Sequence, residues 1–189
     1  MNLPDPFSDP DNLVLIGPMG AGKSSLARQL ARLTSRRWMD TDRMIVQRVG
    51  LPITEIFAKQ GEEAFRELEA EALQSLRSQR RLIVATGGGI VTRPENTEVL
   101  RALGCVVFLS AAPEILFERV SRNQNRPLLH TADPERTLRE LFARRHALYT
   151  ACAHLTVDTS DGTHVALAHA LLERAREFFD RRFAGRLSS

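Results

Sequence analysis

The sequence has little of several features that mark common functional classes. Its 189 residues include only two cysteines, with no C-x-x-C pair, and five scattered histidines, so it indicates neither a disulfide framework nor a zinc site. Aromatic residues make up 6%, and no basic run is interleaved with them, which disfavours nucleic-acid binding despite a net charge of +3. No apolar run approaches membrane-spanning length, and residues 1–11 lack a signal-peptide pattern. We therefore expect a cytoplasmic protein without nucleic-acid or membrane partners.

Lysine is also scarce. The chain has 26 lysine and arginine residues, and only Lys23 and Lys59 are lysine. In a chain that otherwise uses arginine, a lysine indicates a position where arginine would not serve. Lys23 lies in "GPMGAGKSS", where a compact ammonium group would fit between phosphates and a wide guanidinium would not.

Apolar runs and helical spacing alternate along the chain. The runs "NLVLIG", "RRWMD", "LIVAT", "CVVFL" and "HLTVDT" predict strands, and "NLVLIG" and "LIVAT" have the pattern of buried ones. Apolar residues three and four apart predict helices over 22–33, 42–49, 53–59, 61–80, 94–103, 113–122, 134–149 and 165–179. This alternation predicts an α/β protein, with a central five-stranded parallel sheet between two layers of helices. Ligands then bind at the carboxyl ends of the strands.

The chain indicates one domain, because 43% apolar residues suffice for a single core and no long linker divides it. We place this domain at residues 12–180, with a loose leader at 1–11 and a tail at 181–189. Residues 123–134 are polar, contain two prolines and have no apolar periodicity, which predicts a mobile loop. No apolar helix stripe is left over for a partner, so we expect a monomer.

A phosphate-binding loop follows the first predicted strand. "GPMGAGKSS" matches G-x-x-x-x-G-K-[ST], and it lies between a strand and a helix, as that motif requires. Backbone N–H groups of Gly20, Ala21 and Gly22 would surround phosphate oxygens, and the helix N-terminus would add its partial positive charge. Lys23 would reach the β- and γ-phosphates, the hydroxyl of Ser24 would bind Mg²⁺, and Ser25 would also contact ATP. The loop predicts purine nucleotide binding but does not distinguish a kinase from a GTPase or a sensor.

Two acids follow the second predicted strand in "MDTDR". Residues two apart on a strand point the same way, so Asp40 and Asp42 can both face the γ-phosphate, one near the metal and one near an acceptor. The alternative is a pair of solvated loop acids, one of which caps the following helix.

The motifs together resemble those of the shikimate kinases. After "GPMGAGKS" and "DTD" come "LPITEIFAKQGEEAFRELE", "ATGGG", "NRPLL" and "RRHALY", and the resemblance runs from about residue 12 to residue 158. It implies a P-loop kinase fold with a mobile lid and a substrate-binding helical region. It also implies transfer of the γ-phosphoryl group of ATP, with Mg²⁺, to the 3-hydroxyl of shikimate, on the route to aromatic amino acids.

The resemblance assigns roles on the acceptor side. Arg66 of "FRELE" and Arg145 of "RRHALY" would clamp the carboxylate of shikimate, and Asp42 would accept hydrogen bonds from ring hydroxyls. Read without it, Arg66 suits a surface pair with Glu63 or Glu69. The glycines of "ATGGG" would line the acceptor site, where a side chain would collide with substrate, and we expect a backbone N–H contact at the second one. These three are Gly87, Gly88 and Gly89.

On the nucleotide side, Asp40 would hold Mg²⁺ through water, and Arg119 would pack on the adenine, although a plain helix-end charge fits Arg119 nearly as well. Arg126 of "NRPLL" would close on the phosphates from the lid. The catalytic set implied is Lys23, Asp42 and Arg126. The chain departs from the family after the last strand, where family members often carry a polar or basic side chain near the adenine and "VDTSDGTH" offers Ser160 and Asp161, then Gly162.

Two other functions remain open from the sequence. Shikimate-kinase-like domains also occur as effector sensors in transcriptional regulators, but no helix-turn-helix segment precedes "NLVLIG". A kinase for another hydroxy acid, such as gluconate, would share the phosphate loop. The two arginines and the D-T-D motif favour shikimate.

Overall fold

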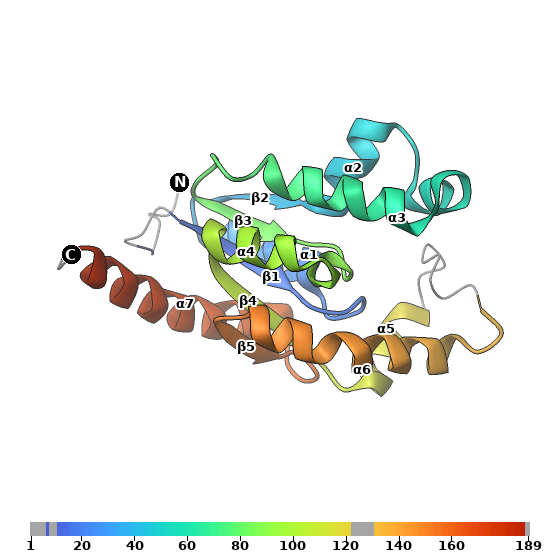
Figure 1. Cartoon of the computed structure of the whole chain (residues 1–189). Helices are drawn as coiled ribbons and strands as arrows, with labels where there is room; N and C mark the ends of the chain where they lie inside the picture. Colours follow the sequence, from blue (N-terminus) through green and yellow to red (C-terminus); the bar gives the residue numbers. More distant parts are fainter. Residues whose placement is uncertain (1–6, 8–10, 122–130, 188–189) are drawn as a thin grey trace.

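The structure, a computed structural model, describes residues 7, 11–121 and 131–187, the last three of these without their side chains. Five parallel strands form one sheet in the order β2-β3-β1-β4-β5 (Figure 1). The predicted five-stranded parallel sheet is therefore confirmed. None of the helices in the described part of the chain has the length and apolar character needed to cross a bilayer.

The elements follow one another in the alternation that the sequence predicts. In chain order they are β1 (Asn12–Ile16), α1 (Lys23–Leu33), β2 (Arg37–Asp40), α2 (Thr41–Val49), α3 (Ile53–Gln74), β3 (Leu82–Ala85), the 3₁₀ turn η1 (Ile90–Thr92), α4 (Pro94–Leu103), β4 (Gly104–Ser110), α5 (Pro113–Ser121), α6 (Pro134–Cys152), β5 (Leu155–Asp158) and α7 (His164–Leu187).

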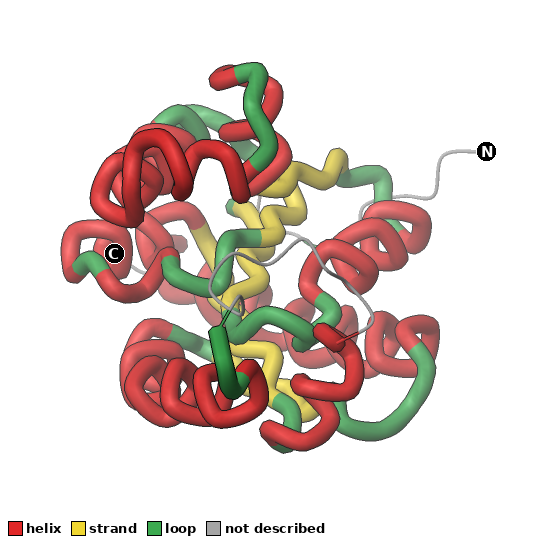
Figure 2. The backbone as a smooth tube through the Cα atoms, turned by 90° about the vertical axis from the view of Figure 1, so that its right-hand side faces the viewer, coloured by secondary structure: helices red, strands yellow, loops and turns green. Residues whose placement is uncertain are grey.

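Helices cover both faces of the sheet, as the end view in Figure 2 shows. Alternate residues of each buried strand point to opposite faces. Leu13 and Leu15 of β1 pack with apolar residues of α1 and α7, whereas Val14 and Ile16 pack with those of α3, α4 and α6. Strands β1, β3 and β4 are mostly apolar because both of their faces are buried, whereas the edge strands β2 and β5 carry exposed polar residues such as Arg37 and Asp158.

Two helices differ from the prediction. The expected helices at 53–59 and 61–80 form one element, α3, which is interrupted at Gly61 (φ 84°, ψ 175°) and ends at Gln74. Glycine adopts this backbone conformation without the steric cost that a side chain would impose. The last helix continues past the expected end at residue 179 to Leu187, so part of the expected tail is helical.

The segment expected to be a leader includes two described residues, and both are buried. The ring centroids of Phe7 and Phe179 lie 5.0 Å apart. The guanidinium carbon of Arg36 lies over the Phe7 ring, 4.5 Å from its centroid. Asp11 is 6% exposed and forms an ion pair with Arg182 at 3.4 Å. These contacts join the start of the chain to α7 and the core, although the boundary at residue 12 stays a prediction.

Candidate active site

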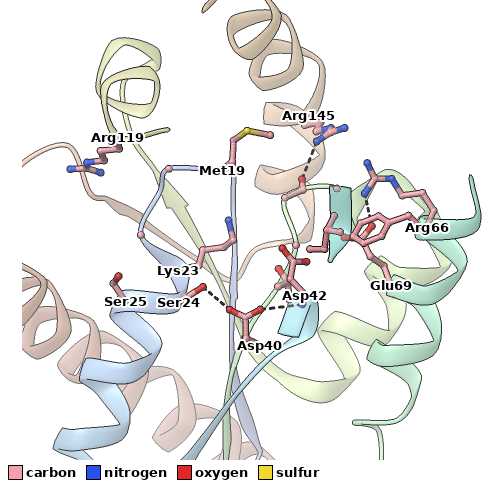
Figure 3. A pocket seen from close by; sticks show the side chains of 18 of the residues that line it. Met19, Lys23, Ser24, Ser25, Asp40, Asp42, Arg66, Glu69, Arg119 and Arg145 are labelled. Atoms are coloured by element: carbon pink, nitrogen blue, oxygen red, sulfur yellow. Dashed lines mark hydrogen bonds and ion pairs between the residues drawn. The ribbon is translucent and has the colours of Figure 1, made fainter. Parts of the chain in front are cut away.

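A cavity of about 550 Å³ opens at the carboxyl ends of β1, β2 and β3 (Figure 3). It contains residues expected to bind the nucleotide and residues expected to bind the acceptor. From the predicted set, its lining includes Gly20, Gly22, Lys23, Ser24, Ser25, Asp40, Asp42, Arg66, Gly87, Gly88, Gly89, Arg119 and Arg145. Residues far apart in the sequence thus meet in one place.

The phosphate loop joins β1 to α1. Gly22, the N-cap of α1, has a left-handed backbone conformation (φ 84°, ψ 14°), which suits glycine. The ammonium group of Lys23 donates to the backbone carbonyls of Gly17 (2.7 Å) and Pro18 (2.8 Å), and the residue is 8% exposed. Ala21 does not line the cavity, because its methyl group lies in the core.

Asp40 performs two tasks with its two carboxylate oxygens. Oδ1 accepts hydrogen bonds from the N–H groups of Asp42 (3.1 Å) and Arg43 (3.3 Å), so it caps α2. Oδ2 accepts from the hydroxyl of Ser24 at 2.6 Å. The cap that the sequence offered as an alternative is therefore present, and it orients the carboxylate toward the phosphate loop.

The strand argument for Asp40 and Asp42 is wrong. Strand β2 ends at Asp40, and Asp42 is the second residue of α2. The two side chains share the cavity because the helix begins directly after the strand, not because they alternate along one strand. Asp42 Oδ1 lies 2.7 Å from the position that a Cβ atom on Gly87 would take.

Arg66 forms a buried charge cluster rather than a surface pair. Its guanidinium donates to Glu69 Oε2 at 2.5 Å and to Glu62 Oε1 at 2.6 Å. Glu69 is 1% exposed, and its Oε1 atom has no hydrogen-bond partner among the described residues. Burial raises the pKa of Glu69 to about 7, against the opposing attraction of Arg66. The sequence suggested the contact with Glu69, but not that it lines the cavity.

The glycine turn follows β3 and lies against this cluster. A Cβ atom on Gly87 would approach Glu69 Oε1 to 2.2 Å, and one on Gly89 would approach Arg66 Nη1 to 2.0 Å. At Gly88 the nearest atom would be Met19 N, at an ordinary 3.4 Å. A side chain at the first and third glycines would therefore collide with the protein's own charged groups, whereas the sequence argument considered only a collision with substrate.

Arg145 reaches the cavity from α6. Its Nη1 donates to the carbonyl of Gly88 at 3.4 Å, and the hydroxyl of Tyr149 donates to the same carbonyl. Its neighbour Arg144 is exposed and donates to the Glu140 carbonyl on the same helix. Of the two adjacent arginines, the one selected by the R-x-x-L-Y spacing therefore lies in the cavity.

Arg119 lies at the other end of the cavity, away from Arg66 and Arg145 (Figure 3). Its guanidinium donates to the carbonyls of Thr159 (2.6 Å) and Ser160 (3.3 Å), in the segment after β5. It is thus held in place rather than solvated. His164, the first residue of α7, lines the same end, and no motif indicated it.

Not every expected residue can be located. Arg126, expected in the lid, lies outside the described residues, as does most of the 123–134 segment. Apolar lining residues also went unnoticed in the sequence, since only the fold brings Ile53, Phe57 and Phe65 to this cavity.

The fold and the cavity define a class of enzyme. A parallel sheet carries a phosphate loop after its central strand, and a second polar site faces that loop across one cavity. This is the P-loop kinase fold, whose members transfer a phosphoryl group from a nucleotide to a small acceptor.

Comparison with known proteins identifies the family. The shikimate kinase family profile matches residues 19–176, and the chain belongs to this family. It is 44% identical over 167 residues to a shikimate kinase of Dechloromonas aromatica, covering 88% of this chain and 90% of that one. The solved shikimate kinase of Acinetobacter baumannii in complex with shikimate is 42% identical, with a TM-score of 0.84, covering 86% of this chain and 91% of that one. A gluconokinase of Sinorhizobium meliloti, 18% identical with a TM-score of 0.54 over 91% and 97%, shares the fold alone.

Proposed function

We propose that this chain transfers the γ-phosphoryl group of ATP to the 3-hydroxyl of shikimate, forming shikimate 3-phosphate for aromatic amino acid biosynthesis. One observation carries the proposal: the phosphate loop and the pair Arg66 and Arg145 line the same cavity. One end suits the phosphates of a nucleotide, and the other suits a small acceptor that carries a carboxylate and hydroxyls.

The acceptor side offers two guanidinium groups in different states. Arg66 is already bound to Glu69 and Glu62 in two ion pairs, whereas Arg145 donates a long hydrogen bond to the Gly88 carbonyl and interacts with the hydroxyl of Tyr149. We infer that Arg145 gives the shikimate carboxylate most of its new contacts. Arg66, held in place by Glu69, would supply the second, fixed set of donors.

On the nucleotide side, Lys23 donates to loop carbonyls that it would exchange for the β- and γ-phosphates. Ser24 and Asp40, in contact at 2.6 Å, supply a hydroxyl and a carboxylate, which are ligand types that Mg²⁺ prefers. The described residues contain no cluster of three His, Cys, Asp or Glu side chains that could hold a metal. Ser24 and, through water, Asp40 would therefore hold Mg²⁺ together with the nucleotide, where the ion neutralises phosphate charge.

Catalysis in this arrangement comes from positioning and charge neutralisation. Asp42 would orient the attacking hydroxyl and receive its proton late, because a loose transition state needs little base strength. Lys23 would stabilise the transferring group, and the resemblance assigns the same task to Arg126. Arg119, held against the segment after β5, would contact the adenine.

The chain suits a monomer. Only three large apolar side chains in the described part of the chain are exposed, and they are Leu148, Val165 and Phe183. Two free cysteines and the use of ATP support action in the cytoplasm. Light scattering behind a sizing column would test the monomer, and a dimer mass at micromolar concentration would overturn it.

The first experiment measures ADP release by the purified protein with Mg·ATP, with and without shikimate, and locates the phosphate by NMR. Release that depends on shikimate, with phosphate on the 3-hydroxyl, is the expected result. Gluconate serves as the matched acceptor control. Shikimate binding without turnover would instead favour the sensor, and turnover of gluconate alone would reassign the acceptor.

A further inference from the structure

The peptide groups of the glycine turn, residues 87–89, have no side chains to restrict their orientation. Hydrogen bonds with side chains of neighbouring elements hold them in place. The Gly87 N–H donates to the hydroxyl of Thr41 at 3.0 Å, and the Gly89 carbonyl accepts from the hydroxyl of Thr92 at 2.7 Å. The carbonyl of Gly88 is bound from α6, by the hydroxyl of Tyr149.

Tyr149 is built into the core in a single orientation. It is 1% exposed, and its ring stacks on that of Phe108 at 5.1 Å between centroids. Burial raises the pKa of Tyr149 to about 12, so the phenol keeps its proton at neutral pH. A buried phenol requires a hydrogen-bond partner, and the Gly88 carbonyl is that partner.

Fixing this carbonyl also fixes the next N–H group. The peptide unit between Gly88 and Gly89 is planar, so its N–H points opposite to the carbonyl that Tyr149 binds. Glycine has unusual conformational freedom, and without this bond the carbonyl would keep only the long hydrogen bond from Arg145, at 3.4 Å, among the described residues. The hydroxyl of Tyr149 therefore helps to fix the direction in which the Gly89 N–H points at one edge of the acceptor site.

The same bond reaches Arg145. Arg145 precedes Tyr149 by one helical turn, so both side chains leave the same face of α6. Both donate to the Gly88 carbonyl. Packing of the ring against Phe108 needs no hydroxyl, so the oxygen atom serves the turn and not the core.

We propose that Tyr149 is a positioning residue for the acceptor: its hydroxyl holds the Gly88 peptide, and with it the spacing between the glycine turn and Arg145. This inference rests on the proposed function, because it concerns how shikimate is held. Tyr149 acts through Gly88 and does not itself line the cavity.

The test replaces Tyr149→Phe, which deletes the hydroxyl and keeps the stacked ring. We expect the KM for shikimate to rise about tenfold, equivalent to about 1.4 kcal/mol, with the KM for ATP within twofold of wild type. Thr150→Val is the matched control, since it deletes an exposed hydroxyl at the next position of α6, which within the described part of the chain donates to the His146 carbonyl. Thermal unfolding of both variants is measured in parallel.

Two results would overturn the proposal. One is a shikimate KM within twofold of wild type in the Phe variant. The other is a rise of both KM values together with a lowered Tm, which indicates a purely structural role. Wild-type turnover of shikimate, measured first, tests the proposed function independently, because the Tyr149 result is read only as a ratio to wild type.

Discussion

Replacing Gly89 by alanine tests whether this position must be glycine because Arg66 occupies the space that a side chain would take. The backbone of Gly89 (φ −96°, ψ −1°) is one that alanine adopts, so the substitution brings no backbone strain. The new Cβ, however, would lie 2.0 Å from Arg66 Nη1 and 2.3 Å from its Cζ. The guanidinium must move, and its bonds to Glu69 and Glu62 must lengthen or break.

The size of the effect follows from those bonds. Each charge-assisted hydrogen bond contributes about 1.5–3 kcal/mol, and displacing Arg66 would also remove its proposed contact with the shikimate carboxylate. We therefore expect Gly89→Ala to raise the KM for shikimate by roughly 10- to 100-fold, with the KM for ATP little changed. Steady-state kinetics with each substrate varied in turn measures both values.

The turn supplies its own control. Alanine at Gly88 would have Met19 N as its nearest neighbour at 3.4 Å, so we expect the Arg66–Glu69 pair to stay in place and the Tm to stay near wild type. Because Gly88 lines the acceptor site, the Tm and not the KM for shikimate is the control value at this position. Gly87→Ala, with Glu69 Oε1 at 2.2 Å, should resemble Gly89→Ala and lower the Tm as well. Wild-type shikimate kinetics in Gly89→Ala, or an equal loss of Tm at all three positions, would refute this reasoning.

Three further predictions concern other parts of the chain. Asp42→Asn should lower kcat at least about 100-fold while nucleotide affinity, measured by calorimetry, survives; wild-type turnover would contradict its role. Because the pKa of Glu69 is raised from 4.5 to about 7, the folded state binds a proton more tightly than the unfolded state. The free energy of unfolding should therefore fall by roughly 3 kcal/mol from this group as pH rises from 4.5 to 7, and denaturant titrations of Glu69→Gln should lack that slope. Phe7→Ala removes a buried ring from Phe179 and should cost about 3 kcal/mol of stability without changing either KM; an unchanged Tm would show that the ring is not part of the core.

The sequence predicts the local features of the fold and site well. The match at Lys23 and Ser24 correctly places a phosphate loop between a strand and a helix. Such features depend on residues close together in the chain. The three central strands β1, β3 and β4 are predicted for the same reason, because parallel strands covered on both faces are mostly apolar.

The error over Asp42 is local: the predicted strand already ends at Asp40 and a helix is predicted over 42–49, so alternation along a strand does not apply to Asp42. Long-range packing accounts for the other errors. The burial of Phe7 depends on Phe179, 172 positions away, which no local pattern reveals. Glu69 belongs to the cavity because Gly87, on another element, has no side chain to exclude it.

The pairing of β1 with β3 has a consequence for the reaction geometry. The phosphate loop leaves β1 and the glycine turn leaves β3, and the strands are paired in register up to Leu15 and Ala85. The N–H and hydroxyl of Thr86 both donate to the Leu15 carbonyl, at 3.2 and 3.0 Å, which extends the pairing to the turn itself. Neighbouring strands lie about 4.8 Å apart, a spacing that is hard to change. The separation of the two substrates therefore depends on hydrogen bonds between two central strands, and evolution could alter acceptor choice through the helices without disturbing the alignment of the substrates.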